Sequence, residues 1–520
     1  MTAQRTFALE SIALVTASSD RTASGPILEL NGTGTAPESL ELVGPRLRMP
    51  GSVEPNAGEP GPHAGDTGSR TWRARVPLCT SRWGGPALPP PSGMYRFVAD
   101  GAILDAAPPE SAPASTVLPA PQLVAGLFRI AFRTTDAGMT VVFTPPLADD
   151  ELGSENQARL EARYRSAPSA PEDAAFFESF YGQNASCNPL ALDRALVRAR
   201  PDTVRYWAVA DASVAVPDGA IAVIEGSAAW WDARANARLI VINDWLRNRF
   251  HKRRHQTVVQ TWHGTMLKKL ALSRRRPGIR PALATLRERS RWDILLAQNE
   301  YAARIFRRAY AYLGPIWEEG YPRDDILVTG DAMAIRARLG IPNDVHVLLY
   351  APTWRDDHPD RVDHLDVARF TEQLGPGYVT LIRGHSRTIQ PGEDVRAGGV
   401  IDVTSYPDVS ELFLAADALI TDYSSVMFDF SVTGKPIYFF TPDLDRYRQV
   451  LRGFYFDLLA VAPGPVVQDP AELVRLVRDP DAVQDEFAAR YAAWRERFNP
   501  HDDGGAAERV MARLIREGRI

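Results

Sequence analysis

Short segments of alternating apolar and polar residues, separated by glycine-, proline- and serine-rich turns, occupy residues 1–150 of the chain. This alternation is typical of half-buried strands, and the regular turns between them predict a small β-sandwich or barrel. Glu54–Ser69 and Ala106–Pro119 have the composition of long loops. The predicted strands are Ile27–Leu30, Leu40–Val43, Trp72–Val76, Tyr95–Val98, Leu127–Ile130 and Thr140–Phe143.

The pattern changes after a polar connector at residues 151–173, because strands and helices then alternate. Two such series follow one another, which predicts an α/β fold with two doubly wound domains, residues 174–335 and 336–520, facing across a cleft. We expect the boundary near Asp331–Asn343 and a helical end from Pro470, broken at Asn499–Gly505. The predicted strands are Val204–Val209, Ile221–Ile224, Leu239–Ile242, Thr257–Gln260, Val345–Tyr350, Tyr378–Ile382, Val400–Val403, Ala418–Ile420 and Ile437–Phe440.

The stretch Ile420–Phe430 shows this change of period most clearly. Leu412–Leu414 leads into a buried strand that ends at Ile420, and a polar turn with Asp422, Ser424 and Ser425 precedes apolar residues at helical spacing. These three side chains are good helix caps, and the free backbone N–H groups of a helix start attract anions. In an open parallel sheet such a turn lies at the carboxyl edge of the strands, where ligands bind. Capping alone is the competing interpretation.

Composition limits the function classes. The 520-residue chain has a net charge of -5 and no nucleic-acid recognition motif, so we expect no binding to nucleic acid. Cys79 and Cys187 lie far apart, which predicts reduced thiols. No signal-peptide core and no apolar run of about 18 residues is present, so a cytoplasmic protein is expected.

Two histidines follow predicted strands at equivalent turns of the two α/β series. His263 comes after Thr257–Thr261 and before a glycine, and His385 follows Arg383 and Gly384. A histidine at such a turn can take a proton from a hydroxyl near neutral pH, and a neighbouring arginine suits a phosphate. Either histidine alone is more often structural, but the paired placement favours a catalytic interpretation.

Two basic clusters flank His263, one including Arg253 and Arg254 and the other Lys268 and Lys269. A single cluster is usually a solvated face. Two clusters around a candidate base, in a chain of net negative charge, predict a local cationic patch for a polyanionic acceptor or an anionic membrane surface. Asp356, Asp357 and His358 are the best metal-ligand candidates, and a solvated loop is the stronger interpretation of them.

Several ordered motifs together resemble the CDP-glycerol glycerophosphotransferase family of teichoic acid polymerases. The resemblance runs from about Phe176 to the C-terminus and does not extend clearly to the β-rich part. Gly384 and Met266 depart from it, because the family usually has proline at both positions. The motifs are Phe177–Gly182, Asn188–Pro189, Gln260–Lys268, Tyr350–Arg355, Arg383–His385, Asp408–Leu412, Thr421–Phe430 and Arg452–Asp457.

The resemblance implies a GT-B architecture and transfer of glycerol phosphate from CDP-glycerol to a poly(glycerol phosphate) or lipid-linked acceptor, with release of CMP and no cofactor or required metal. It implies that His263 and His385 are the catalytic histidines. Arg383, Ser424, Ser425 and Asp422 are then expected at the donor phosphates, with Glu411 as a ribose contact and Arg452 as a further phosphate contact. The cationic patch would bind the acceptor or hold the enzyme peripherally at the inner leaflet of the cell membrane.

Three alternatives remain open at this stage. The donor could be CDP-ribitol or another CDP-polyol, because the motifs bind the nucleotide and phosphates rather than the polyol. A GT-B nucleotide-sugar glycosyltransferase would share the fold. A catalytically idle scaffold would use the β-rich part for recruitment. That part has no catalytic spacing, and a structural, acceptor-binding or partner-binding role is equally open.

Overall fold

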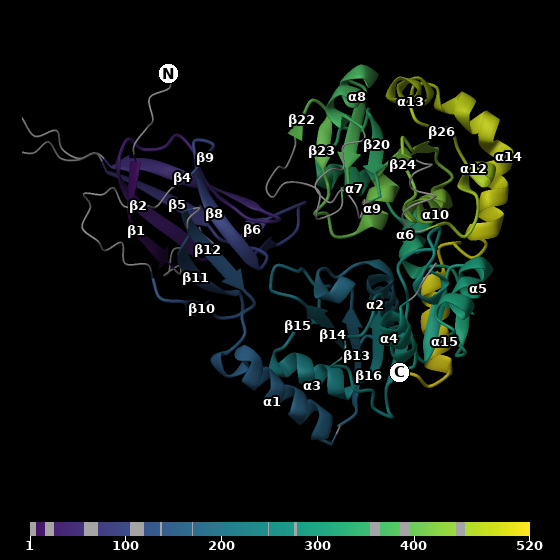
Figure 1. The fold of residues 1–520 in the computed structure, drawn as a ribbon, viewed down its shortest axis with the longest axis horizontal. Helices are drawn as coiled ribbons and strands as arrows, with labels where there is room; N and C mark the ends of the chain where they lie inside the picture. Colours follow the sequence, from purple (N-terminus) through teal and green to yellow (C-terminus); the bar gives the residue numbers. More distant parts are fainter. Residues whose placement is uncertain are drawn as a thin grey trace, which may run out of the picture. The chain divides into compact units, whose positions relative to one another are not determined.

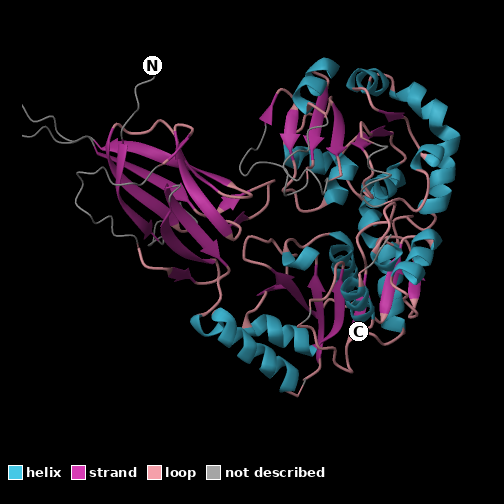
Figure 2. Ribbon diagram, viewed as in Figure 1, coloured by secondary structure: helices cyan, strands magenta, loops and turns pink. Residues whose placement is uncertain are grey.

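The computed structural model describes residues 7–15, 25–56, 71–104, 119–135, 138–168, 170–247, 249–274, 278–353, 365–384, 396–443 and 453–520. The chain divides into two compact units. The first consists mainly of Met1–Gly153, and the second holds most of the remaining chain. Figure 2 shows that strands dominate the first unit, whereas the second combines strands with many helices.

The first unit is an antiparallel ten-stranded sheet in the order β1-β2-β5-β4-β3-β8-β12-β11-β10, with β9 paired to β8. Strand β4 pairs with β3 through its first residues and with β5 through its last, so it joins the two halves of the sheet. One apolar core, which includes Trp72, Tyr95 and Phe97, collects side chains from both halves. The strands are β1 Phe7–Val15, β2 Ile27–Gly34, β3 Leu40–Val43, β4 Arg48–Asn56, β5 Thr71–Pro77, β6 Thr80–Ser81, β7 Ala87–Leu88, β8 Gly93–Ala99, β9 Ala102–Ile103, β10 Gln122–Val124, β11 Phe128–Thr135 and β12 Gly138–Thr144.

Each strand predicted in this part falls within or overlaps an observed one, because alternate residues are buried as the pattern requires; β5, for example, buries Trp72, Ala74 and Val76. The interval predicted as a loop from Glu54 differs at its start, since β4 continues to Asn56. The rest of that interval, and nearly all of the one from Ala106, lie outside the described residues.

The second unit contains two seven-stranded sheets (Figure 1). The first has the order β15-β14-β13-β16-β17-β18-β19, and all its pairings are parallel. Its strands are β13 Glu172–Glu178, β14 Val204–Val209, β15 Ile221–Ile224, β16 Ala237–Ile242, β17 Thr257–Gln260, β18 Ile294–Ala297 and β19 Ile316–Glu318. Its helices are α1 Gly153–Ser166, η2 Phe180–Gly182, α2 Cys187–Ala199, α3 Ala228–Asn236, η3 Ala271–Ser273, α4 Ile279–Arg289, α5 Glu300–Ala309 and η4 Pro322–Asp324.

The second sheet has the order β22-β23-β21-β20-β24-β25-β26 and is parallel except for the β22–β23 pair. Its strands are β20 His346–Ala351, β21 Tyr378–Ile382, β22 Arg396–Ala397, β23 Val400–Asp402, β24 Ala418–Thr421, β25 Ile437–Phe440 and β26 Val466–Val467. Its helices include α6 Asp325–Thr329, α7 Ala332–Leu339, α8 Val367–Leu374, α9 Val409–Ala415, α10 Val426–Phe430, η5 Ser431–Thr433, α12 Leu458–Val461, α13 Pro470–Val477 and α14 Pro480–Phe498.

Two features of the second unit differ from the sequence prediction. Strand β13 begins at Glu172, inside the interval predicted as a connector, which also contains helix α1. Leu412–Leu414, which precedes β24, belongs to helix α9, and Asp408 caps this helix. The C-terminal helix α15, Ala506–Arg516, packs on the first sheet through residues such as Val510 and Leu514, although it follows the second sheet in the sequence.

The α/β class of the second unit is therefore as predicted, and the N-terminal unit is β-rich. Within the described residues, no helix has both the length and the apolar character needed to cross a bilayer.

Candidate active site

His263 stands on a turn at the carboxyl end of β17, and buried side chains hold the backbone of this turn. Gln260 accepts a hydrogen bond from the Trp262 N–H at 2.9 Å, and the Thr261 hydroxyl donates to the Ile242 carbonyl. The Asn188 amide donates to the carbonyls of Thr261 and Trp262 at 3.2 and 3.1 Å. Since Asn188 is fully buried, these bonds are shielded from water and fix the turn.

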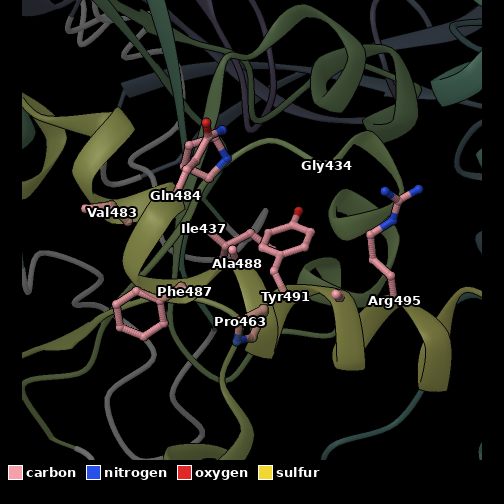
Figure 3. Close-up of a pocket in the computed structure, with 11 residues that line it drawn as sticks. Gly434, Ile437, Pro463, Val483, Gln484, Phe487, Ala488, Tyr491 and Arg495 are labelled. Carbon is pink, nitrogen blue, oxygen red and sulfur yellow. The ribbon is translucent and has the colours of Figure 1, made fainter.

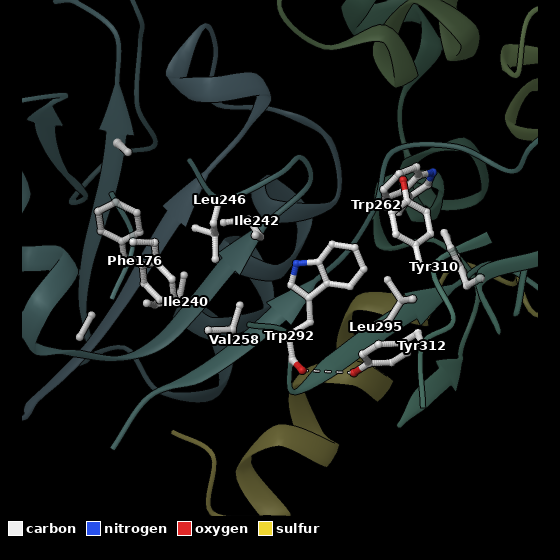
Figure 4. Close-up of a cluster of buried hydrophobic side chains, with 14 of the residues drawn as sticks. Phe176, Ile240, Ile242, Leu246, Val258, Trp262, Trp292, Leu295, Tyr310 and Tyr312 are labelled. Atoms are coloured by element: carbon white, nitrogen blue, oxygen red, sulfur yellow. Dashed lines mark hydrogen bonds between the residues drawn. The ribbon is translucent and has the colours of Figure 1, made fainter. Parts of the chain in front are cut away.

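Trp262 adopts a left-handed backbone conformation with φ of 56°, which is unfavourable for a non-glycine residue. Its indole compensates by packing edge-on against Phe306 and Tyr310, each with a centroid distance of 5.4 Å. Figure 4 shows Trp262 and Tyr310 side by side at one end of the apolar cluster of the first sheet. Phe180 and Tyr181 also have positive φ. Strained backbone of this kind concentrates at functional sites.

The His263 ring is held in one tautomer. Its Nδ1 lies 2.5 Å from the Asn243 carbonyl oxygen, which can only accept, so Nδ1 carries the proton and Nε2 keeps its lone pair. The ring stacks on Trp262 at 5.0 Å and contacts Phe180 at 5.6 Å. Burial lowers the pKa of His263 below 6.5, and the charge of Asp244 opposes this shift. The ring is therefore neutral at pH 7, as a general base must be.

The turn after His263 meets the Ser424–Ser425 turn of the second sheet. A Cβ atom built on Gly264 would lie 3.0 Å from the Ser425 hydroxyl, which is closer than ordinary van der Waals contact. The two turns can approach this closely because glycine has no side chain. Lys268 Nζ lies 3.4 Å from the Thr353 hydroxyl, and the Thr353 N–H donates to Asp422 at 2.9 Å. Three of the motifs singled out in the sequence therefore lie together.

A fourth motif adds to this group through backbone contacts. The Lys269 N–H donates to the Gly453 carbonyl at 3.2 Å, and the Tyr455 N–H donates to the Leu267 carbonyl at 2.8 Å. The Tyr455 hydroxyl in turn accepts from the Leu270 N–H at 3.1 Å. The segment after Arg452 is thus fastened to the segment after His263.

The capping interpretation of the Asp422–Ser425 turn is wrong. Asp422 accepts from the Thr353 and Tyr423 N–H groups, so it ties β24 to the end of β20. Ser425 occupies the N-cap position of α10, but its side chain makes no capping hydrogen bond. Helix α10 has 5 residues, too few for a substantial macrodipole. An anion at this turn would therefore gain little from a helix dipole, and the half-buried Ser424 and Ser425 are candidate side-chain ligands.

Arg383 and Glu411 both hold the loop that follows β23. Arg383 donates to the carbonyls of Val403 and Tyr406 at 3.3 and 2.8 Å, and burial lowers its pKa to about 10, which leaves it cationic at neutral pH. Glu411 accepts from the Tyr406 hydroxyl at 2.5 Å and from Arg338 at 2.8 Å. Glu411 therefore has a structural role, the binding of Tyr406 and Arg338, that could not be predicted from the sequence.

The predicted basic patch is divided between different environments. Arg253 donates to the Tyr164 carbonyl and lies over the Tyr164 ring, whereas Arg254 is exposed. Lys268 and Lys269 are half-buried beside the site. Arg253 is thus tied to helix α1, although the sequence placed it in the patch with Arg254.

Several candidates fall outside the described residues: His385, Arg452, Asp356, Asp357 and His358. Among the residues that are described, no group of three or more His, Cys, Asp or Glu side chains is arranged to hold a metal ion.

Arg323, on η4, is a site residue that sequence reasoning missed. The Arg323 guanidinium donates to Asp429 on α10 at 2.6 Å, and the backbone N–H of Arg323 donates to the Asn188 side-chain oxygen at 3.0 Å. No spacing rule distinguishes Arg323 from the many other arginines, because its partners are distant in sequence. Asn188 was noted only as part of a motif, and its contact with the Trp262 turn required the structure.

A separate hollow lies between helix α14 and the start of β25 (Figure 3). Phe487, Tyr491 and Arg495 line it together with Pro436 and Pro463. None of the predicted site residues belongs to its lining. We therefore place the candidate active site at the His263 turn.

Most of the second unit is similar to known proteins. Residues 162–516 match the family model described as CDP-glycerol:poly(glycerophosphate) glycerophosphotransferase. The chain is 35% identical over 359 residues to the teichoic acid poly(glycerol phosphate) polymerase of Bacillus subtilis, covering 64% of this chain and 48% of that protein. It is 34% identical over 368 residues to the teichoic acid glycerol-phosphate transferase of Staphylococcus aureus, covering 66% and 92%.

A solved structure gives the same result for the fold. The wall teichoic acid polymerase TagF, in a variant soaked with CDPG, superposes with a TM-score of 0.63 at 32% identity, covering 70% of this chain and 98% of that one. The match spans about half the length of the first two curated polymerases, 48% and 49%.

Proposed function

The chain belongs to the CDP-glycerol:poly(glycerophosphate) glycerophosphotransferase family, and on this premise we propose that it transfers glycerol phosphate from CDP-glycerol to a poly(glycerol phosphate) or lipid-linked acceptor, releasing CMP. The observation that carries the proposal is His263, a neutral histidine with an unprotonated Nε2, beside the Ser425 turn. This geometry brings a candidate base and a serine hydroxyl to neighbouring turns.

In the proposed reaction, Nε2 of His263 takes the proton of the acceptor's terminal hydroxyl. The hydroxyl oxygen forms a bond to the β-phosphorus of CDP-glycerol, and the bond from that phosphorus to the bridging oxygen breaks, so CMP leaves with the electron pair. Charge in such a transfer spreads over the phosphoryl oxygens, and catalysis consists mainly of positioning and electrostatic stabilisation.

We assign the donor phosphates to Arg383, Ser424 and Ser425, together with His385 and Arg452. Arg383 stays cationic, and its guanidinium has more N–H groups than its two carbonyl contacts with described residues use, which supports the assignment. Asp422 and Glu411 act indirectly in this proposal. Asp422 fixes the serine turn through Thr353, and Glu411 fixes the loop that Arg383 also holds.

The two seven-stranded sheets of the second unit are proposed to form a GT-B pair. The first sheet, with His263, would serve the acceptor, and the second, with the serine turn, would serve the donor nucleotide across a cleft. Ligands in open α/β sheets bind outside the carboxyl ends of the strands, and β17, β20 and β24 all end at the group of motifs described above.

We also propose peripheral binding to the cytoplasmic face of the cell membrane, through helix α4. Ile279, Leu283 and Leu286 form one exposed stripe, with exposed fractions of 81, 59 and 37%. Arg280 and Arg287 border one side of the stripe and are also exposed. An apolar stripe bordered by arginines suits an interface with anionic lipids, where each arginine contributes about 1 kcal/mol. A lipid-linked acceptor would be presented at that surface.

CMP release from purified protein tests the transferase proposal. The protein is incubated with a glycerol phosphate primer and, in separate reactions, CDP-glycerol, CDP-ribitol or a nucleotide sugar. CMP from CDP-glycerol, with lengthening of the primer, is expected. If CMP is released only from CDP-ribitol, the donor is CDP-ribitol rather than CDP-glycerol. If product forms only from the nucleotide sugar, the protein is a glycosyltransferase. No product from any donor would support the scaffold alternative.

A further inference from the structure

A buried charged cluster joins the two sheets of the second unit directly beneath the candidate active site. Arg323, Asp324, Asp429 and Asp502 are 7, 1, 0 and 8% exposed. Arg323 contacts Asp324 and Asp429, and Gln298 joins Asp324 to Asp502, so one cation serves a buried group of three carboxyl groups. Three ionised carboxylates beside one guanidinium would leave uncompensated buried charge, which is costly enough that such a site retains protons.

The Arg323–Asp429 pair links the two sheets. Arg323 follows β19 of the first sheet, and its Nε and Nη2 atoms donate to the same oxygen of Asp429 at 3.0 and 2.6 Å. Asp429 lies on α10, one helical turn after Ser425. Arg323 Nη2 and the Ser425 hydroxyl both border the space above Gly264, at 3.6 and 3.0 Å from the position of a Cβ atom there. The ion pair therefore lies next to both the His263 turn and the serine turn.

The other oxygens of the cluster show where a proton is held. The second oxygen of Asp429 and one oxygen of Asp324 are buried and have no hydrogen-bond donor among the described residues. The Asp324 oxygen without a donor lies 3.9 Å from Arg323 Nε, the same atom that donates to Asp429 at 3.0 Å, so both carboxyl groups lie beside one guanidinium. Asp324 accepts from Gln298 through its remaining oxygen at 3.1 Å. Burial, and next the charge of Asp429, raise the pKa of Asp324 well above its ordinary value.

We propose that Asp324 and Asp429 share one proton, and that this carboxyl pair together with Arg323 is a positioning device for the transfer reaction, holding the serine turn against the His263 turn. A proton on the unpaired oxygen of Asp324 would donate to the unpaired oxygen of Asp429. Asp429 then stays negatively charged and pairs with Arg323. In this proposal, none of the three residues touches the reacting atoms. The inference rests on the proposed function, because it concerns the alignment of the same site.

We expect different consequences from Asp324→Asn and Asp429→Asn, although the two substitutions are equal in size. Asp324→Asn supplies an N–H in place of the shared proton, and its amide oxygen still accepts from Gln298. Asp429→Asn and Arg323→Lys instead remove the charge pair or its two-point geometry. Misplacement of reacting groups by about 1 Å can reduce turnover about a hundredfold without comparable loss of binding.

The experiment measures kcat and KM for CDP-glycerol by CMP release in the three variants and the wild type. Arg163→Lys is the matched control, because its ion pair with Asp232 is exposed on both sides, at 63 and 56%. All variants are assayed below their midpoints of thermal unfolding, measured by circular dichroism. We expect kcat to fall about a hundredfold in Asp429→Asn and Arg323→Lys with little change in KM, and to stay near wild type in Asp324→Asn and the control.

Two results would overturn the inference. If Asp429→Asn or Arg323→Lys is folded and keeps wild-type kcat, the pair does not position the site. If Asp324→Asn loses as much kcat as Asp429→Asn, the shared proton is absent. Both results require an active wild type. A wild type that releases no CMP from any donor instead contradicts the proposed function, so the two failures are distinguishable.

Discussion

The Nδ1 atom of His263 lies 2.5 Å from the carbonyl oxygen of Asn243. Because a carbonyl cannot donate, this contact assigns the ring proton to Nδ1 and leaves Nε2 as the basic atom. The strained Trp262 beside it keeps the ring in place through its own packing. The role proposed for His263 as the base follows from these contacts.

Replacing His263 by alanine should reduce CMP release by a factor of about 10²–10⁴, the usual contribution of a general base. Binding of CDP-glycerol should change little, because the base acts on the acceptor. Turnover is measured by CMP release and donor binding by titration calorimetry. His251→Ala is the control, since that side chain is exposed. Wild-type turnover in His263→Ala would exclude it as the base.

The acid limb of the pH profile should lie below pH 6.5. Burial lowers the pKa of His263, so Nε2 is half protonated at a pH below the ordinary histidine value. The midpoint of the decline in activity on the acid side should therefore lie below pH 6.5. The measurement is kcat/KM for the acceptor against pH, with circular dichroism to verify folding. A limb centred above pH 6.5 would contradict the assignment.

Gly264→Ala should raise KM for CDP-glycerol. The new Cβ would lie 3.0 Å from the Ser425 hydroxyl, in a backbone conformation with φ of 152°, so Ser425 must rotate or the turns must separate. Either change moves a proposed phosphate ligand, and a loss of roughly 1–3 kcal/mol is expected. Gly340→Ala is a matched control, because its φ is also positive, at 68°, but nothing lies within 4 Å. Equal kinetics in both variants would show that the contact with Ser425 is irrelevant.

Glutamate at Ile279 and Leu283 should abolish binding to anionic lipid vesicles while leaving CMP release from a soluble primer intact. The substitutions remove apolar area from the α4 stripe and add repulsion from anionic headgroups. Binding is followed by vesicle sedimentation at several salt concentrations. Leu313→Glu is the control, since Leu313 is 86% exposed but lies outside α4. If the α4 variant sediments with vesicles as the wild type does, α4 is not the membrane-binding surface.

Charge reversal at Lys268 and Lys269 separates acceptor binding from membrane binding. Both residues lie beside the site, and Lys268 contacts Thr353, so their reversal should weaken primer binding and raise the acceptor KM in a salt-dependent way. Vesicle binding through α4 should persist. If primer KM is unaffected at low salt, these lysines have only a local structural role.

The secondary-structure elements and the chemical groups of the candidate site could be predicted from the sequence. Alternation in β5 and the fully buried runs of β17 and β24 could be recognised without coordinates, because burial of one or both strand faces dictates which residues are apolar. His263 stood out for the same reason, since it directly follows such a strand. Its ordered motifs were also sufficient to identify the family.

Tertiary structure alone decided the partners. Asp422 is a residue type that often caps helices, but here it links two strands. Arg253 donates to the Tyr164 carbonyl rather than joining an open basic patch. Helix α15 returns to the first sheet, and Arg323 meets Asp429 across more than a hundred residues of sequence. Local patterns specify backbone and burial, whereas a hydrogen-bond or ion-pair partner depends on which distant elements packing brings within about 3 Å.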